Sequence, residues 1–103
     1  MPTLSGDRIR HSVVFTLAHE AGSEREADFL RAIADLASIP GVEAFELMRE
    51  VSPKNGFDHA LTMEFADRGA YEAYNVHPNH TRFVESRWDA EVKDFLEVDT
   101  AAR

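Results

Sequence analysis

Apolar residues that recur at every second position most constrain how this chain can fold. From Ile9 to Leu17 every second residue is apolar apart from His11, so that one side holds Ile9, His11, Val13, Phe15 and Leu17; this is typical of a β-strand with one buried face. Ser52 to Gly56 is turn-forming sequence between two further alternating runs, so these two runs are expected to form an antiparallel hairpin. Four strands are predicted in all, at residues 9–17, 42–51, 57–65 and 93–99.

Helical spacing separates these strands. Ser23 and Glu26 have the spacing of a capping box, and apolar residues then recur at intervals of three and four, so a helix is predicted over residues 23–38. A second helical region is predicted over residues 68–75 and 79–92. It is interrupted at His77-Pro78 because the residue before a proline is disfavoured in the α conformation.

The resulting order, βαββαβ, predicts an α+β, ferredoxin-like fold in which helices cover one face of a four-stranded antiparallel sheet. The other face is expected to be more apolar than a solvated surface requires. A second copy of the sheet is its simplest cover, so the sequence predicts a homodimer. The residues expected on this open face are Val14, Phe45, Leu47, Ala60, Thr62 and either Phe95 or Leu96.

Length and charge restrict the domain count and the partners. A chain of 103 residues suits one domain, expected at 8–99, with tails at 1–7 and 100–103. A net charge of -8 without a cluster of Lys or Arg argues against nucleic acid and anionic membranes as partners. The chain contains no cysteine and no apolar run of about 18 residues, which suits a cytoplasmic protein that does not span a membrane.

Four histidines and a tyrosine are expected to converge on one apolar cavity. Tyr74, His77 and His80 are spaced three apart, so they share one face of a gently broken helix. His11 and His59 lie on the apolar faces of their strands. A small apolar or aromatic molecule is the expected ligand, and the apolar residues expected to contact it are Val13, Phe15, Leu61 and Phe83.

Several short stretches together resemble the stress-responsive A/B barrel domain (Dabb) family. They are Ile9-Arg10-His11, Ile39-Pro40-Gly41-Val42, Asp58-His59-Ala60-Leu61 and the run from Ala73 to His80. The resemblance implies a dimeric α+β barrel made from two four-stranded sheets. The family includes stress-induced plant proteins and a plant polyketide cyclase that works without cofactor or metal. By position, the resemblance implies that His80 is a general base and Tyr74 a hydrogen-bond donor to an enolate oxygen.

Structural roles are the alternative for each of these polar residues. His77 would shape the helix break, Tyr74 would find a partner at the edge of the core, and His11 and His59 would satisfy each other or a backbone carbonyl. His19 is expected to be exposed and without function. No metal site is predicted, because zinc usually needs three or four protein ligands, and no glycine-rich loop for a nucleotide or flavin cofactor is present.

Three functions remain open from the sequence. The first is a cofactor-independent cyclase or lyase-type enzyme that takes a proton from a carbon next to a carbonyl group in a ketone or polyketide. The second is a non-catalytic, ligand-binding or stress-associated dimer. The third, a monooxygenase of the same barrel architecture, rests on analogy of fold alone.

Overall fold

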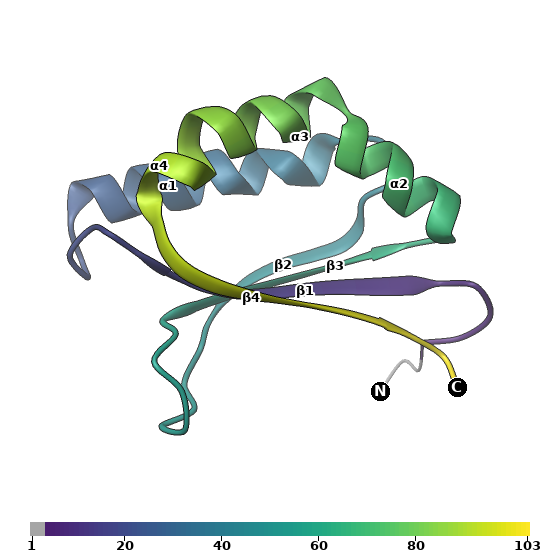
Figure 1. Cartoon of the computed structure of the whole chain (residues 1–103), viewed down its shortest axis with the longest axis horizontal. Coiled ribbons are helices and arrows are strands. Elements are labelled where there is room, and N and C mark those ends of the chain that lie inside the picture. Colours follow the sequence, from purple (N-terminus) through teal and green to yellow (C-terminus); the bar gives the residue numbers. More distant parts are fainter. Residues whose placement is uncertain (1–3) are drawn as a thin grey trace.

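The computed structural model of the protein describes residues 4–103, and it confirms the expected order of strands and helices (Figure 1). Residues 1–3, which belong to the expected N-terminal tail at 1–7, lie outside the described part. The elements are β1 (Ile9–Leu17), α1 (Glu24–Ala34), the 3-10 turn η1 (Asp35–Ser38), β2 (Glu43–Arg49), β3 (His59–Phe65), α2 (Arg68–Val76), α3 (Pro78–Phe83), the π-helical turn η2 (Val84–Trp88), α4 (Asp89–Glu91) and β4 (Val92–Ala101).

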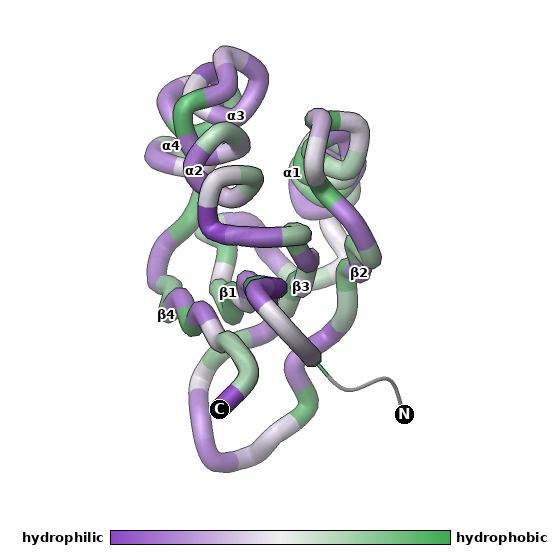
Figure 2. The backbone as a smooth tube through the Cα atoms, turned by 90° about the vertical axis from the view of Figure 1, so that its right-hand side faces the viewer, coloured by the Kyte–Doolittle hydropathy of each residue, from purple (hydrophilic) through white to green (hydrophobic). Residues whose placement is uncertain are grey.

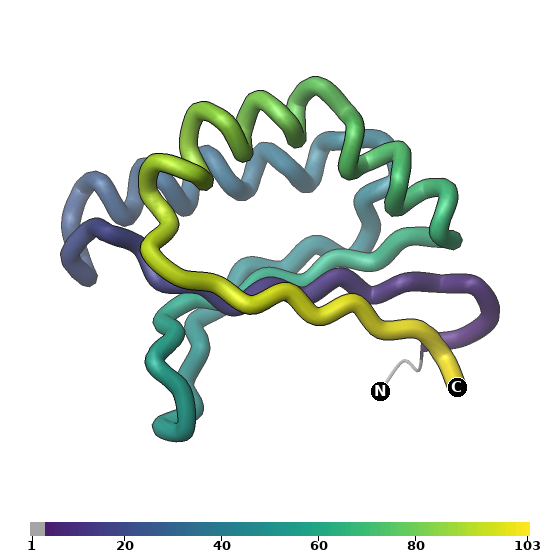
Figure 3. Tube along the Cα trace, viewed as in Figure 1, coloured from purple at the N-terminus to yellow at the C-terminus, as the bar shows by residue number. Residues whose placement is uncertain are grey.

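The four strands form one antiparallel sheet in the order β2-β3-β1-β4. All helices lie on one face of this sheet, with α1 in one row and α2 to α4 in a second row beside it (Figures 1 and 2). The connection between β2 and β3 extends away from the helical layer (Figure 3). The predicted ferredoxin-like α+β fold is therefore confirmed.

The first helix begins as its sequence predicts. The hydroxyl oxygen of Ser23 accepts a hydrogen bond from the backbone N–H of Glu26 at 3.2 Å, and the Glu26 carboxylate accepts one from the N–H of Gly22 at 3.0 Å. The first bond satisfies an N–H group that the first turn of a helix leaves open, and the second fixes the residue before the N-cap against the same turn. The α-helix ends at Ala34, and a 3-10 turn continues to Ser38. The helical region therefore ends at the predicted residue, but its last turn is a tighter 3-10 turn.

The core lies between the sheet and the helical layer. Every second residue of β1 and β3 is buried, as the alternation predicts. Aromatic rings fill the centre: the ring of Phe15 lies 6.1 Å from that of Phe29 and 5.2 Å from that of Trp88. The largest fully buried side chains are Tyr74, Phe15, Phe29, Phe65, Ile33 and Met63. Their burial removes most of the apolar surface of one sheet face from water.

The prediction for the open face of the sheet is wrong in β2. Leu47 pairs with Leu61, which faces the helices, so Leu47 packs against the core and Met48 takes the open face opposite Ala60. Phe45 also packs against the core. The strand has an irregular register between Glu43 and Glu46, and Ala44 adopts a positive φ of 49° there. Alternation showed two faces of β2, but only pairing with β3 decides which of them is buried.

The last strand is longer than predicted. It continues to Ala101, because Thr100 and Ala101 pair with Arg10 and Ile9 of β1. The segment expected to be a tail from residue 100 therefore contributes two residues to the sheet. None of the helices within residues 4–103 combines the length and apolar character needed to cross a bilayer.

Candidate active site

A cavity of about 270 Å³ lies between the sheet and the second helical row. Six of the nine residues predicted for the site line it: His11, Val13, Leu61, Tyr74, His80 and Phe83. The remaining lining residues come from α1, η1, α2, the π-helical turn, α4 and β4: Ile33, Leu36, Asn75, Val84, Trp88, Asp89, Phe95 and Glu97. The cavity thus has apolar walls and a small group of polar side chains, which is typical of a small-molecule site.

His80 is held by the end of the preceding helix. Its ring Nδ1 lies 3.0 Å from the carbonyl oxygen of Asn75. A carbonyl oxygen can only accept, so Nδ1 carries the proton and Nε2 of the neutral ring keeps its lone pair. Burial lowers the pKa of His80, against a smaller opposing effect of this hydrogen bond. The ring is therefore a neutral acceptor near neutral pH.

Tyr74 lies against His80, with 4.4 Å between the ring centroids. Burial, which is the largest cause, raises the pKa of its hydroxyl above the ordinary value, so the group stays protonated and can donate a hydrogen bond. Among residues 4–103 every fully buried side-chain N or O atom has a partner, whereas this hydroxyl makes no hydrogen bond. The hydroxyl therefore touches accessible space, and Tyr74 is one of the residues that line the cavity.

His11 belongs to a second polar group, which sequence reasoning did not find. Its Nδ1 lies 2.6 Å from one carboxylate oxygen of Asp99, and the hydroxyl of Tyr71 donates to the other at 2.9 Å. His11 and Tyr71 are buried, while Asp99 lies half-exposed on β4. Burial, followed by the hydrogen bond to Asp99, raises the pKa of Tyr71, so its hydroxyl remains a donor. The expected pairing of His11 with His59 is absent from the described contacts, because β1 pairs His11 with Met63 instead.

The other two predicted histidines lie outside the cavity lining. His59 is buried beside Phe15, and its Nε2 lies 3.4 Å from the carboxylate of Glu26 on α1. His77 is the N-cap of α3, where its Nδ1 accepts a hydrogen bond from the backbone N–H of Asn79 at 3.1 Å. Phe15, predicted as a wall residue, is fully buried in the core and is likewise not part of the lining.

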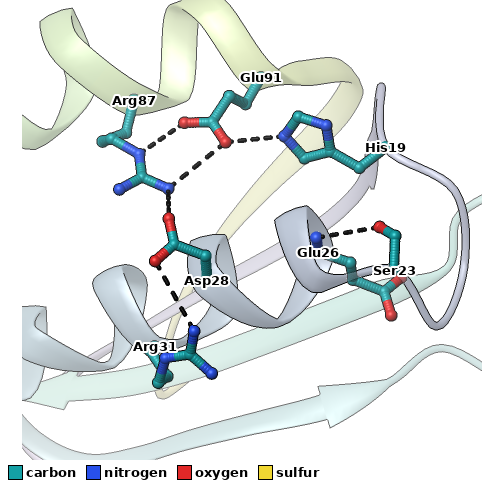
Figure 4. Close-up of polar contacts among 7 residues, drawn as sticks. All are labelled: His19, Ser23, Glu26, Asp28, Arg31, Arg87 and Glu91. Atoms are coloured by element: carbon teal, nitrogen blue, oxygen red, sulfur yellow. Dashed lines mark hydrogen bonds and ion pairs between the residues drawn. The ribbon is translucent and has the colours of Figure 1, made fainter.

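The prediction that His19 is exposed is wrong. Only 13% of its side chain is accessible, and its Nε2 donates to the Glu91 carboxylate at 2.7 Å (Figure 4). Arg87 also donates to Glu91 and reaches Asp28 of α1 at 2.8 Å. Burial opposes ionisation of Glu91, but the hydrogen bonds from Arg87 and His19 outweigh it and hold the pKa of this carboxyl below its ordinary value. This network, which we call the His19–Glu91–Arg87–Asp28 clasp, ties the second helical row to α1.

The charge of the cavity wall is negative. Glu97 and Asp89 line it, and Asp99 lies behind His11. No arginine or lysine is among the lining residues. Within residues 4–103 no three His, Asp or Glu side chains are grouped closely enough to hold a metal ion. The polar chemistry that the described part of the site offers is therefore that of two imidazoles, a phenol and two carboxylates.

Comparisons with known proteins agree with this fold. Residues 9–102 match the family described as Stress responsive A/B Barrel Domain. A crystal structure of a Dabb family protein from Mesorhizobium loti is similar at 47% identity, with a TM-score of 0.91 and coverage of 93% of this chain and 97% of that one. A search among curated proteins gave no match.

Two more distant structures show the same fold. One is a dimeric ferredoxin-like protein of unknown function from Thermobifida fusca, at 20% identity and a TM-score of 0.77, covering 97% of this chain and 95% of that one. The other is hydroxynitrile lyase from Passiflora edulis, at 14% identity and a TM-score of 0.81, covering 94% of each chain. At these identities the similarity is one of fold alone. The match over residues 9–102 and the similarity to the Mesorhizobium loti protein establish that this chain belongs to the stress responsive A/B barrel domain (Dabb) family.

Proposed function

We propose that the protein is a cofactor-independent enzyme that removes a proton from a carbon next to a carbonyl group, in a cyclase or lyase-type reaction. The observation that carries this proposal is the hydrogen bond from Nδ1 of His80 to the carbonyl of Asn75. This bond fixes the tautomer in which Nε2 is the proton acceptor, and His80 lines the cavity beside Tyr74.

The two residues have complementary roles in such a reaction. His80 takes the proton from the carbon, and the electron pair left behind delocalises onto the carbonyl oxygen. The Tyr74 hydroxyl donates a hydrogen bond to this oxygen as its negative charge develops. A phenol whose pKa is raised by burial suits this role because it does not lose its own proton.

The substrate is a small neutral molecule. Aromatic and aliphatic walls such as Trp88, Phe83 and Leu61 favour an apolar body, and a cavity of about 270 Å³ limits its size. The carboxylates of Glu97 and Asp89 disfavour an anion, since like charges in a partly desolvated site repel strongly. The hydroxynitrile lyase shows that this fold can hold a lyase site, although fold alone does not assign an activity.

Deuterium exchange tests this proposal without knowledge of the natural substrate. The probe is 4-phenylbutan-2-one, a neutral ketone with an apolar ring, incubated with the protein in D2O and followed by NMR. We expect catalysed exchange next to the carbonyl, and a loss of about 100-fold or more in His80→Ala. The matched control is Glu72→Gln, which changes an exposed side chain of α2 outside the cavity lining.

Two results would contradict the proposal. One is the absence of catalysed exchange in the wild type, and the other is an equal rate in His80→Ala. Stoichiometric binding of the ketone without exchange would instead support the non-catalytic, ligand-binding function.

We also propose that the protein is a homodimer formed through the open face of the sheet. Leu96 and Val98 of β4 expose 53% and 46% of their surface on this face, beside Val14 and Ala60. Burial of such an apolar face against a second copy is favourable. The related structure from Thermobifida fusca is described as dimeric.

Sedimentation equilibrium tests the dimer. We expect twice the chain mass for the wild type and for Val76→Glu, which adds a charge at an exposed position of α2 on the helical layer. Leu96→Glu places the same charge in the proposed interface and is expected to give the monomer. A monomeric wild type at micromolar concentration would refute the dimer.

A further inference from the structure

Asp99 holds the ring of His11 in one orientation. The two oxygens of its carboxylate accept from Nδ1 of His11 at 2.6 Å and from the hydroxyl of Tyr71 at 2.9 Å. A carboxylate that accepts from both groups is itself fixed in position, and it fixes the tautomer of the imidazole with the proton on Nδ1. The three residues come from β1, α2 and β4, so the arrangement depends on the whole fold.

The other nitrogen of His11 has no protein partner. Among residues 4–103 each fully buried side-chain N or O atom is hydrogen-bonded, and Nε2 of His11 makes no such bond. It therefore borders accessible space, and His11 lines the cavity. A histidine with a purely structural role would be expected to have both nitrogens engaged in so buried a place.

His11 and His80 approach the same part of the cavity. The Tyr74 ring lies 6.4 Å from the ring of His11 and 4.4 Å from that of His80, measured between centroids. Each imidazole has Nδ1 bound to a fixed acceptor, Asp99 in one case and the Asn75 carbonyl in the other, and both residues line the cavity. Two proton-transfer groups around one phenol can serve two oxygen or carbon centres of a single ligand.

We propose that His11 is a second proton-transfer residue of this cavity, that Asp99 and Tyr71 are its positioning residues, and that the substrates are neutral β-hydroxy ketones or the carbonyl compounds formed from them. This inference rests on the proposed function of His80 and Tyr74. It adds the chemistry of a second polar group, which proton removal from a simple ketone does not need.

The proposed reaction breaks one carbon–carbon bond. Nε2 of His11 takes the proton of the β-hydroxyl group, the bond between the α and β carbons breaks, and the oxygen-bearing carbon leaves as an aldehyde or ketone. The electron pair stays with the α carbon as an enolate, whose oxygen accepts from the Tyr74 hydroxyl. The proton on Nε2 of His11 then passes through water to Nε2 of His80, which gives it to the α carbon. Both imidazoles thereby return to their starting states, and the reverse sequence is an aldol addition.

A pair of matched probes tests the role of His11. The first, 4-hydroxy-4-phenylbutan-2-one, carries the β-hydroxyl group and is cleaved to benzaldehyde and acetone, which absorbance detects. The second, 4-phenylbutan-2-one, has the same carbon skeleton without the hydroxyl group and reports only proton exchange. Each probe is given to the wild type, His11→Gln, Asp99→Asn and the control Asp58→Asn, whose exposed side chain lies outside the cavity lining.

We expect His11→Gln to lower the rate of cleavage by about 100-fold while exchange is kept. Asp99→Asn should lower cleavage by about tenfold, since a positioning residue acts through its partner. Intact exchange in both variants shows that the protein and the His80 end of the cavity are folded. Asp58→Asn should match the wild type in both reactions.

Other outcomes overturn the inference. If cleavage is unchanged in His11→Gln, or if cleavage and exchange fall by the same factor, His11 has a structural role and only this inference fails. If the wild type catalyses neither reaction, the proposed function fails and this inference fails with it.

Discussion

The ring of His80 contacts the ring of Tyr74 at a centroid distance of 4.4 Å, while its Nδ1 is bound to the carbonyl of Asn75, one residue after that tyrosine. The break at Pro78 produces this arrangement. Because α2 ends at Val76 and α3 begins at Pro78, the chain turns between Asn75 and His80 and leaves the Asn75 carbonyl open to a side chain. One turn of irregular backbone thus sets both the tautomer of His80 and its contact with Tyr74.

Removal of the Tyr74 hydroxyl is expected to impair turnover without unfolding the protein. In Tyr74→Phe the buried ring is kept, so its contacts with Phe65 and His80 remain. The loss of one donor to a developing oxyanion should lower kcat of ketone exchange by about 100-fold. Exchange kinetics together with a thermal melt check this expectation. A rate equal to that of the wild type would assign Tyr74 to packing alone.

The rate of exchange should fall in acid with a midpoint below the ordinary histidine value of about 6.5. Burial lowers the pKa of His80, so the neutral, proton-accepting form persists to a lower pH than in a free histidine. The lowered pKa of His80 also makes the folding stability depend on pH. This contribution is fully present above the pKa of His80 in the unfolded state, and it is lost as the pH falls through the lower pKa of the folded state. A pH–rate profile of the wild type measures the midpoint, and a midpoint above 6.5 would contradict the assignment of His80 as the buried base.

The clasp should contribute to folding stability in a pH-dependent way. Glu91→Gln removes the charge that His19 and Arg87 share, and hydrogen bonds to a charged group typically contribute about 1.5–3 kcal/mol. The pKa of Glu91 is lowered in the folded protein, so its contribution is present above the unfolded pKa and is lost as the pH falls through the folded pKa.

Urea unfolding at neutral and at acidic pH measures this effect. The deficit of Glu91→Gln relative to the wild type should be larger at neutral pH. Glu85→Gln, at an exposed position of the neighbouring π-helical turn, is the matched control and should show little change at either pH. An equal deficit at both pH values would mean that packing, and not charge, explains the effect.

His77 is expected to act on stability through its cap. In His77→Ala the N–H of Asn79 loses its acceptor, which should cost about 1 kcal/mol of folding free energy. Asparagine is a strong N-cap residue, so His77→Asn should restore most of this loss. Chemical denaturation of the two variants provides the comparison. A similar loss in both would show that the imidazole ring contributes by a contact other than the cap.

Local patterns predicted the elements that depend on nearby residues. The alternation in β1 and β3 placed His11, Val13 and Leu61 on the buried face, and helical spacing placed Tyr74 and His80 together. These predictions succeeded because the side-chain period of a strand or helix is a property of the backbone itself. The interruption at His77-Pro78 was predictable for the same reason, since the restriction on the residue before proline is local.

The sequence by itself therefore determined the order of elements, the fold class and one part of the cavity lining, Tyr74 with His80. Tertiary structure alone decided that Leu47 faces the core, that His19 joins the clasp, and that Asp99 reaches His11 across 88 positions of the chain. The physical reason is strand register. Pairing of β4 with β1 sets Asp99 opposite His11, and a shift by one residue would turn Asp99 to the other face. No pattern within either strand specifies that register.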